Sequence, residues 1–257
     1  MKVFFDTVGC RLNQAEIERY ARQFTAMGHE LAADADSADL VIVNTCSVTS
    51  AAASDSRGKV RSASKNGARV VVTGCWSTME PEIAAAMEGV SEVISNSEKD
   101  HLTEKVLGLP QDSFDLEPLK RVILPGVHAR TRAFIKVQDG CDNHCTFCVT
   151  HLVRGKSRSV PEERILKDVQ AALNAGGKEI VLAGVNLGAW GLDMDPPLEL
   201  ADLIEFLLRE TDIPRIRLSS LESWNLSDRF LDLWKNPRMC PHFHLPLQSG
   251  SDRKSNV

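Results

Sequence analysis

The sequence predicts an α/β protein that begins with a parallel β-sheet. Short apolar runs rich in Val, Ile and Phe alternate with longer stretches of helical periodicity in the first part of the chain. The 257 residues are 43% hydrophobic and 25% charged, which is typical of a folded globular protein and too apolar for a disordered one. Alternating strands and helices favour right-handed βαβ units. The length allows one large domain or two of moderate size.

The expected elements of the first part can be assigned in chain order. The predicted strands are Lys2–Val8, Asp39–Asn44, Ala68–Thr73 and Val90–Ile94. The second of these is a continuous apolar run, which is typical of a parallel strand buried on both faces. The predicted helices are Asn13–Met27, Ser50–Lys65 and Pro81–Met87. Gly28 is suited to end the first helix, and Pro81 is suited to the first turn of the third.

The second part continues the alternation after a linker predicted at Pro110–Pro125. Its predicted strands are Arg132–Asp139, Glu179–Ala183, Arg215–Leu218 and His242–Leu247. Its predicted helices are Pro161–Ala175, Leu198–Glu210 and Ser227–Trp234.

Cysteine usage and the amino terminus indicate a reducing compartment. No apolar run approaches the roughly 20 residues of a membrane helix, and the chain turns polar at Asp6, too early for a signal peptide. Seven cysteines are too few, and odd in number, for a disulfide scaffold. We therefore expect a cytoplasmic protein with no membrane partner, in which cysteines bind metal or take part in chemistry.

Three cysteines follow three predicted strands. Cys10, Cys46 and Cys75 each come just after a strand, about one βαβ unit apart. Because parallel strands end at one edge of their sheet, where open α/β folds bind ligands, we expect these thiols at a common edge. Three thiols can hold three irons of a cubane cluster and leave the fourth open. The alternative is three buried, inert cysteines.

A second group of cysteines is compact. Cys141, Cys145 and Cys148 form a C-x3-C-x2-C pattern with Phe147 before the last cysteine. Such tight thiolate spacing suits an iron–sulfur cluster with one open iron. Zinc is the competing metal, and it would need a fourth ligand such as His144 or His151.

The remaining cysteine lies apart from both groups. Cys240, His242 and His244 alternate, so they share one face of the predicted last strand. A metal site is conceivable there, but an inward-packing strand face is the expected role.

At these residues the sequence resembles the radical S-adenosylmethionine (SAM) superfamily, whose signature is C-x3-C-x-aromatic-C. More narrowly it is similar to the methylthiotransferases, in which a domain with three scattered cysteines precedes a radical-SAM barrel. The matching stretches follow family order: TVGCRLNQAE (7–16), VNTCSVT (43–49), VTGCW (72–76), KVQDGCDNHCTFC (136–148), RGKSRS (154–159), AGVNLGAWG (183–191), RLSSLES (217–223) and HFHLPLQSGSD (242–252).

The resemblance implies an α/β fold with two domains. Residues 1–115 would form an N-terminal parallel-sheet βαβ domain, and residues 128–257 a truncated radical-SAM partial (β/α) barrel. The barrel would be incomplete at its C-terminus, and the family's C-terminal RNA-binding β-domain would be absent. We therefore expect the chain to bind clusters through six cysteines but to turn over poorly or not at all.

The resemblance also implies two [4Fe–4S] clusters and SAM as cofactors. Cys141, Cys145 and Cys148 would hold the cluster whose open iron binds SAM, and the resulting radical would remove hydrogen from C2 of an adenine. Cys10, Cys46 and Cys75 would hold an auxiliary cluster that carries the inserted sulfur, and a second SAM would supply the methyl group. The remaining predicted cofactor-binding residues are Phe147, Gly184, Asn186, Ser219 and Gln248.

The implied substrate is N6-threonylcarbamoyladenosine 37 in the tRNA anticodon loop, because Arg11-Leu12-Asn13 differs from the motifs of two other branches. Those branches act on isopentenyladenosine in tRNA and on a ribosomal-protein aspartate, and both remain alternatives. An electron-donor protein and a sulfur donor are the other implied partners. A non-catalytic iron–sulfur or zinc-binding fragment is an alternative of another class.

A net charge of −5 is unusual for a tRNA-binding protein, but basic residues gather near the cysteines. The basic stretches are 49–76, 120–132 and 151–159. We expect Arg154, Lys156 and Arg158 to contact RNA phosphates, with an affinity that falls as salt rises. Trp76 or Trp190 is the expected stacking platform for a base.

Overall fold

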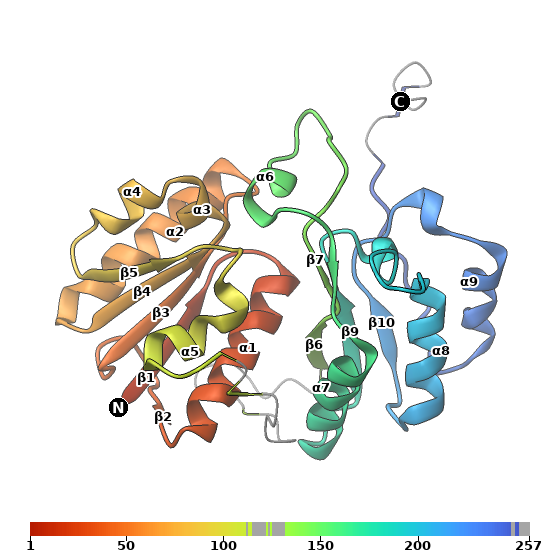
Figure 1. Ribbon diagram of the computed structural model, residues 1–257, viewed down its shortest axis with the longest axis horizontal. Helices are drawn as coiled ribbons and strands as arrows, with labels where there is room; N and C mark the ends of the chain where they lie inside the picture. The colour runs from red at the N-terminus through yellow and green to blue at the C-terminus, as the bar shows by residue number, and fades with distance from the viewer. Residues whose placement is uncertain (112, 115–121, 123, 125–131, 248–249, 252–257) are drawn as a thin grey trace.

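The computed structural model describes residues 1–111, 113–114, 122, 124, 132–247 and 250–251. Two α/β halves lie side by side (Figure 1). In the part that is described, the first half holds a five-stranded parallel sheet, and the second holds a three-stranded parallel sheet and a two-stranded ribbon. The predicted α/β class, with a parallel-sheet domain followed by a partial barrel, is confirmed.

The first sheet brings the first three cysteines to one edge. Its strand order is β2-β1-β3-β4-β5. The strands are β1 (Lys2–Thr7), β2 (Glu30–Leu31), β3 (Leu40–Thr45), β4 (Arg69–Gly74) and β5 (Val90–Ile94). All neighbours are parallel, so β1, β3 and β4 end together, and Cys10, Cys46 and Cys75 follow those ends. The short β2 was not predicted, because two residues carry no periodic signal.

Helices cover both faces of this sheet. They are α1 (Arg11–Ala26), α2 (Ser50–Ala63), α3 (Cys75–Met79), α4 (Pro81–Ala85) and α5 (Leu102–Leu107), with 3₁₀ turns at Ser64–Asn66 and Lys99–His101. Ile17, Phe24 and Leu102 from α1 and α5 pack on one face. Val60 and Trp76 from α2 and α3 pack on the other. Apolar side chains alternate between the faces of β3 and β4, which gives the three-layer structure its two cores.

The second half is built on the sheet order β10-β9-β6. Its strands are β6 (Arg132–Lys136), β9 (Glu179–Ala183) and β10 (Ile216–Leu218), and β7 (Gln138–Asp139) pairs antiparallel with β8 (Arg158–Ser159). Its helices are α6 (Thr150–Arg154), α7 (Glu162–Asn174), α8 (Leu200–Glu210) and α9 (Asp228–Asp232), and 3₁₀ turns lie at Leu187–Ala189, Ser223–Asn225 and Leu233–Lys235. Ile180, Leu203 and Ile204 belong to one core between this sheet and its helices.

Helix α1 joins the two halves (Figure 1). It packs on β1 with one side and on β6 with another. Arg22 of α1 forms an ion pair with Asp168 of α7. Strand β6 is an edge strand of its sheet, and an uncovered edge would invite pairing with other chains. Helix α1 therefore covers that edge, which explains why so many of its polar residues are buried.

The predicted strand at His242–Leu247 is wrong. In this described stretch the structure has only an isolated bridge between Ser220 and His244. Pro241 and Pro246 lack the amide hydrogens that a sheet ladder needs, which explains the absence of a regular strand.

The predicted inward-packing face of Cys240, His242 and His244 forms only in part. Cys240 is buried as predicted, but His244 is exposed and contacts the Ser220 hydroxyl at 2.8 Å.

Most of the predicted linker at Pro110–Pro125 lies outside the described residues. Among the described helices, none combines the length and the apolar character needed to cross a membrane.

Candidate functional site

The first cysteine group is assembled by the loops at the sheet edge. Cys10 is the N-cap residue of α1, Cys46 follows β3, and Cys75 begins α3. Cys46 and Cys75 are buried, and Cys10 is exposed. Burial raises the pKa of Cys46, and the nearby thiols Cys10 and Cys75 raise that pKa further. The parallel strands β1, β3 and β4 end at one edge of the sheet, and the three thiols follow those ends.

Asn13 and Gly9 hold two of these loops together. The Asn13 side-chain amide donates to the carbonyls of Val8 at 2.8 Å and Thr45 at 3.1 Å. Gly9 has φ of 101°, and a Cβ there would lie 2.6 Å from the Cys46 sulfur. The backbone before Cys10 can therefore approach Cys46 only because residue 9 is glycine.

The second cysteine group occupies the loop after the ribbon strand β7. Cys141 and Cys148 are half-buried, and Cys145 is exposed. The Cys141 amide donates to the Gly155 carbonyl at 3.0 Å, which closes the loop on the residue after α6. Burial raises the pKa of Cys141, and Cys148 and Cys145 raise that pKa further. The structure thus brings these three thiols into one loop region as well.

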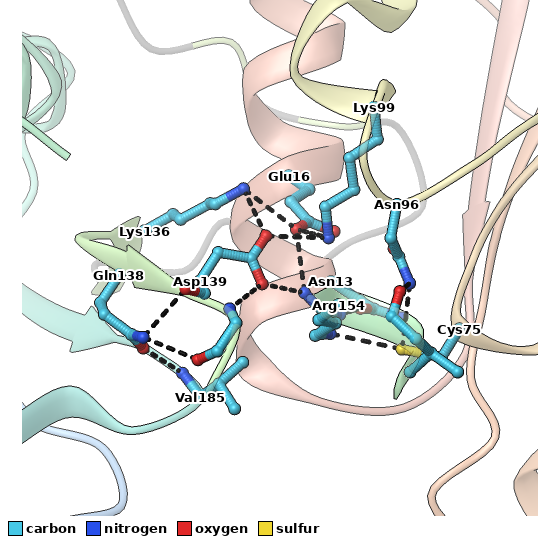
Figure 2. Close-up of polar contacts among 12 residues, drawn as sticks. Asn13, Glu16, Cys75, Asn96, Lys99, Lys136, Gln138, Asp139, Arg154 and Val185 are labelled. Atoms are coloured by element: carbon cyan, nitrogen blue, oxygen red, sulfur yellow. Dashed lines mark hydrogen bonds and ion pairs between the residues drawn. The ribbon is translucent and has the colours of Figure 1, made fainter. Parts of the chain in front are cut away.

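Arg154 lies between the two groups, and its predicted contact with RNA is wrong. Its side chain is only 4% exposed. Figure 2 shows its guanidinium between Cys75 and Asp139. Nε donates to the Cys75 sulfur at 3.3 Å, and Nη1 donates to Asp139 Oδ1 at 2.9 Å. Arg154 is therefore an internal connection and cannot reach a phosphate on the surface.

A cluster of buried charges surrounds Arg154. Lys99 Nζ lies 2.5 Å from Glu16 Oε1, and Lys136 Nζ lies 2.8 Å from Asp139 Oδ2. Burial alone would raise the pKa of Asp139, but Lys136, Lys99 and Arg154 lower it well below its usual value. These side chains come from both halves, so their ion pairs fix one half against the other.

Gln138 is a functional residue that the sequence did not single out, since it appears above only within the stretch 136–148. It is fully buried, and its Oε1 accepts from the amides of Val185 and Asn186, each at 2.9 Å. Its Nε2 donates to the Gly140 carbonyl at 2.7 Å and to Ser157 Oγ at 2.9 Å. One side chain therefore fixes the start of the cysteine loop, the residue before β8 and the loop after β9. Figure 2 shows its contact with Val185.

We expect Gln138→Ala to lower the free energy of unfolding by roughly 2–4 kcal/mol, because it leaves buried donors and acceptors unpaired. Urea denaturation of the full chain measures this change. Gln111→Ala, at an exposed glutamine, is the matched control and is expected to stay near wild type. A stability for Gln138→Ala equal to that of the control would contradict the bracing role.

The predicted cofactor residues occupy different positions relative to these loops. Gly184 and Asn186 follow β9, and the Gly184 amide donates to Ser219 Oγ at 3.4 Å. Asn186 Oδ1 is buried and, among the described residues, has no hydrogen-bond partner. Phe147 is 71% exposed, so it is not a core aromatic. Gln248 lies outside the described residues.

The other predicted RNA contacts have mixed outcomes. Lys156 is exposed, and the Arg158 side chain is 42% exposed. Trp76 and Trp190 are 1% and 0% exposed, so neither is an available stacking platform and that prediction is wrong. Both indoles instead fill hydrophobic cores. Most of the basic stretch 120–132 lies outside the described residues.

The donor sets fit iron–sulfur clusters. Each group offers three thiols, and the Cys75 sulfur accepts hydrogen bonds from Arg154 and Asn96. In the described part of the chain, no three His, Cys, Asp or Glu side chains converge closely enough for one metal ion. Three thiols are the ligand set that holds three irons of a cubane cluster.

Two known families match the chain. Residues 2–95 match the family described as "Uncharacterized protein family UPF0004", and residues 135–257 match the radical SAM superfamily. The first match spans Cys10, Cys46 and Cys75, and the second begins in β6 and spans Cys141, Cys145 and Cys148.

Curated relatives align with nearly the whole chain. The threonylcarbamoyladenosine tRNA methylthiotransferase MtaB of Chlamydia pneumoniae is 36% identical, over 95% of this chain and 57% of its own length. MtaB of Thermotoga maritima is also 36% identical, over 97% and 59%. A tRNA-2-methylthio-N(6)-dimethylallyladenosine synthase of Helicobacter pylori is 28% identical, over 98% and 60%. The chain spans about three fifths of the length of these relatives.

A solved structure shares the fold. The radical SAM methyltransferase TsrM from Kitasatospora setae, with tryptophan and a SAM analogue bound, superimposes with a TM-score of 0.63 at 14% identity. The superposition covers 95% of this chain and 58% of that one. At this identity the likeness concerns the fold alone.

Proposed function

This chain matches the radical SAM superfamily over residues 135–257 and is similar over nearly its whole length to the methylthiotransferases. From this similarity we propose that it transfers a methylthio group to C2 of N6-threonylcarbamoyladenosine 37 in tRNA. One observation carries the proposal. Two separate three-thiol groups lie on adjoining loops, and Arg154 contacts a thiol of one and the loop before the other. A reaction that generates a radical and inserts sulfur needs two such sites near each other.

In this proposal the two thiol groups have different tasks. Cys141, Cys145 and Cys148 hold a [4Fe–4S] cluster, and Cys10, Cys46 and Cys75 hold an auxiliary one. When bound, these groups supply the electron that cleaves SAM and the sulfur that is inserted.

The protein's own residues bind and orient the cofactor. Gln138 fixes the loop of Gly184 and Asn186 beside the radical-SAM cysteines. The unpartnered Asn186 Oδ1 is suited to accept a hydrogen bond from SAM, and Ser219 supports the Gly184 amide. The exposed Phe147 is available to cover the adenosine.

The choice of nucleoside follows the names of the relatives. Several relatives at 34–36% identity are named for threonylcarbamoyladenosine tRNA, whereas the one named for dimethylallyladenosine is 28% identical. A ribosomal-protein aspartate is the other alternative substrate. The tRNA anticodon loop, an electron-donor protein and a sulfur donor are the proposed partners.

An anaerobic turnover assay separates these substrates. We expect the cluster-loaded chain, with reductant and SAM, to form 5′-deoxyadenosine faster with tRNA that carries threonylcarbamoyladenosine than with tRNA that lacks it. Stimulation by a ribosomal protein or by isopentenyladenosine tRNA alone would overturn the assignment.

The surface for tRNA is proposed around Lys156 and Arg158. Both follow α6: Lys156 lies between α6 and β8, and Arg158 is the first residue of β8, which pairs with β7 just before the radical-SAM cysteines. Arg158 is partly held by the carbonyl of Arg154 at 3.3 Å, so its guanidinium lies near the domain junction.

Lys156→Ala with Arg158→Ala is expected to weaken tRNA binding and to reduce the slope of log affinity against log salt by about 2, one for each lost phosphate contact. Filter binding over a range of salt concentrations measures both effects. Lys178→Ala is the matched control, because this exposed lysine precedes β9 at the opposite end of the strand. A double variant with the wild-type affinity and slope would exclude this surface.

A further inference from the structure

Arg154 contacts four groups, three of which lie in the first half. It lies at the end of α6, in the second half, yet its Nε donates to the sulfur of Cys75 in the first half. Its Nη2 donates to Asn13 Oδ1 at 2.7 Å. Its Nη1 contacts both Asp139 Oδ1 and Glu16 Oε1, at 2.9 Å and 3.4 Å. No donor nitrogen of this guanidinium lacks a partner.

These contacts fix the direction of the Nε–H bond. Two carboxylates and one amide oxygen hold the other nitrogens of a planar group, so the guanidinium cannot rotate away from Cys75 without losing buried ion pairs. The sulfur also accepts from Asn96 Nδ2 at 3.7 Å, and that amide in turn donates to the Val153 carbonyl at 2.9 Å. Residues 153 and 154 of α6 thus both reach the Cys75 site.

A fixed cationic donor has a defined effect on a cluster thiolate. Hydrogen bonds to ligand sulfurs are one of the levers that set the reduction potential of an iron–sulfur cluster. Reduction adds negative charge to the cluster, and a nearby positive N–H donor stabilises that charge. The donor therefore raises the potential, and its removal lowers it.

The same side chain reaches the loop of the other cysteine group. Asp139 Oδ1, which accepts from Arg154, also accepts from the Gly140 amide at 2.9 Å, directly before Cys141. Gly140 has φ of 73°, and a Cβ there would lie 1.9 Å from the Lys156 carbonyl oxygen. One path from Cys75 to the Cys141 loop therefore runs through Arg154 and Asp139 (Figure 2).

We propose that Arg154 is a positioning residue for the auxiliary cluster and raises the reduction potential of that cluster through its hydrogen bond to Cys75. Arg154 reaches this site from the radical-SAM half of the chain. This inference rests on the proposed function, because it assumes that Cys10, Cys46 and Cys75 hold a cluster. Its consequence is that the auxiliary site has its full electrostatic environment only when the two halves are docked.

The test uses the full chain with Cys141→Ala, Cys145→Ala and Cys148→Ala, so that only the auxiliary site remains. After anaerobic reconstitution, a redox titration followed by electron paramagnetic resonance gives the reduced-to-oxidised ratio at a fixed potential. We expect Arg154→Met to lower this ratio about tenfold, which is about 59 mV for a one-electron couple. Lys178→Met, at an exposed lysine just before β9, is the control and is expected to leave the ratio unchanged.

The outcomes separate this inference from the proposed function. If the chain with the three radical-SAM cysteines replaced binds no iron, both are overturned. If that chain binds its cluster but the Arg154→Met variant has the same ratio as the control, only the role of Arg154 is overturned. If the Met variant binds no iron, Arg154→Lys carries the test, because it keeps a positive charge beside Glu16 and Asp139 but cannot make all four contacts. A lowered ratio in the Lys variant supports the inference, and a wild-type ratio overturns it.

Discussion

Replacement of Cys10, Cys46 and Cys75 together by Ala is expected to remove about four of about eight irons per chain, the content of one [4Fe–4S] cluster. The three thiols share one sheet edge, and none belongs to the loop of the second group. Replacement of Cys141, Cys145 and Cys148 is expected to remove the other four. Iron and acid-labile sulfide after anaerobic reconstitution measure both losses.

A single cysteine outside the two groups provides the control for this experiment. Cys240 is buried, and burial raises the pKa of its thiol, so we expect it to remain a protonated core residue. Cys240→Ala should therefore retain about eight irons. An equal loss of iron in Cys240→Ala, or no loss in one of the triple variants, would contradict the assignment of ligands.

Glu16→Gln is expected to lower the free energy of unfolding by roughly 3–5 kcal/mol, the usual effect of breaking a buried ion pair. Glu16 is 3% exposed and contacts Lys99, Lys136 and Arg154, so the neutral amide leaves three buried cations with less compensation. Urea denaturation at neutral pH measures the change. Glu88→Gln, at an exposed position, is the matched control and should stay near wild type.

The same variant has a predicted pH dependence. Burial would raise the pKa of Glu16, but Lys99, Arg154 and Lys136 outweigh it and lower this pKa below its ordinary value of 4.5. A carboxylate with a lowered pKa in the folded state stabilises the fold above its unfolded pKa, and this contribution is lost as the pH falls through the folded value. The advantage of wild type over Glu16→Gln should thus be full at neutral pH and shrink below about pH 4.5. An advantage that stays constant down to low pH would contradict the ion-pair account.

The sequence was sufficient for the elements that carry strong local signals. The apolar run of β3 and the periodic helix α1 both form near their predicted bounds, because burial on two faces and on one helical stripe leaves clear patterns. The placement of Cys10, Cys46 and Cys75 after parallel strands followed from topology alone. The predicted strand at His242–Leu247 does not form because Pro241 and Pro246 interrupt the apolar alternation that predicts it.

Tertiary burial could not be read from the sequence. Arg154 lies in a basic stretch, and such stretches are normally solvated, so nothing local indicated that it is buried against Cys75 and Asp139. Gln138 and Glu16 lie within the stretches that resemble the family, but the sequence assigned neither of them a role of its own. Their partners lie far away in the chain, and a pairing between distant polar residues has no periodic signature. The available signal was a polar residue within an otherwise buried strand or helix face.

The most direct test of the account is the composition of tRNA from a strain that lacks its own threonylcarbamoyladenosine methylthiotransferase and expresses this chain. Mass spectrometry of the nucleosides is predicted to show 2-methylthio-N6-threonylcarbamoyladenosine at a low level, because this chain spans about three fifths of its relatives' length, and none when the chain carries Cys145→Ala. Methylthiolation of isopentenyladenosine alone, or product that persists with Cys145→Ala, would contradict the assignment.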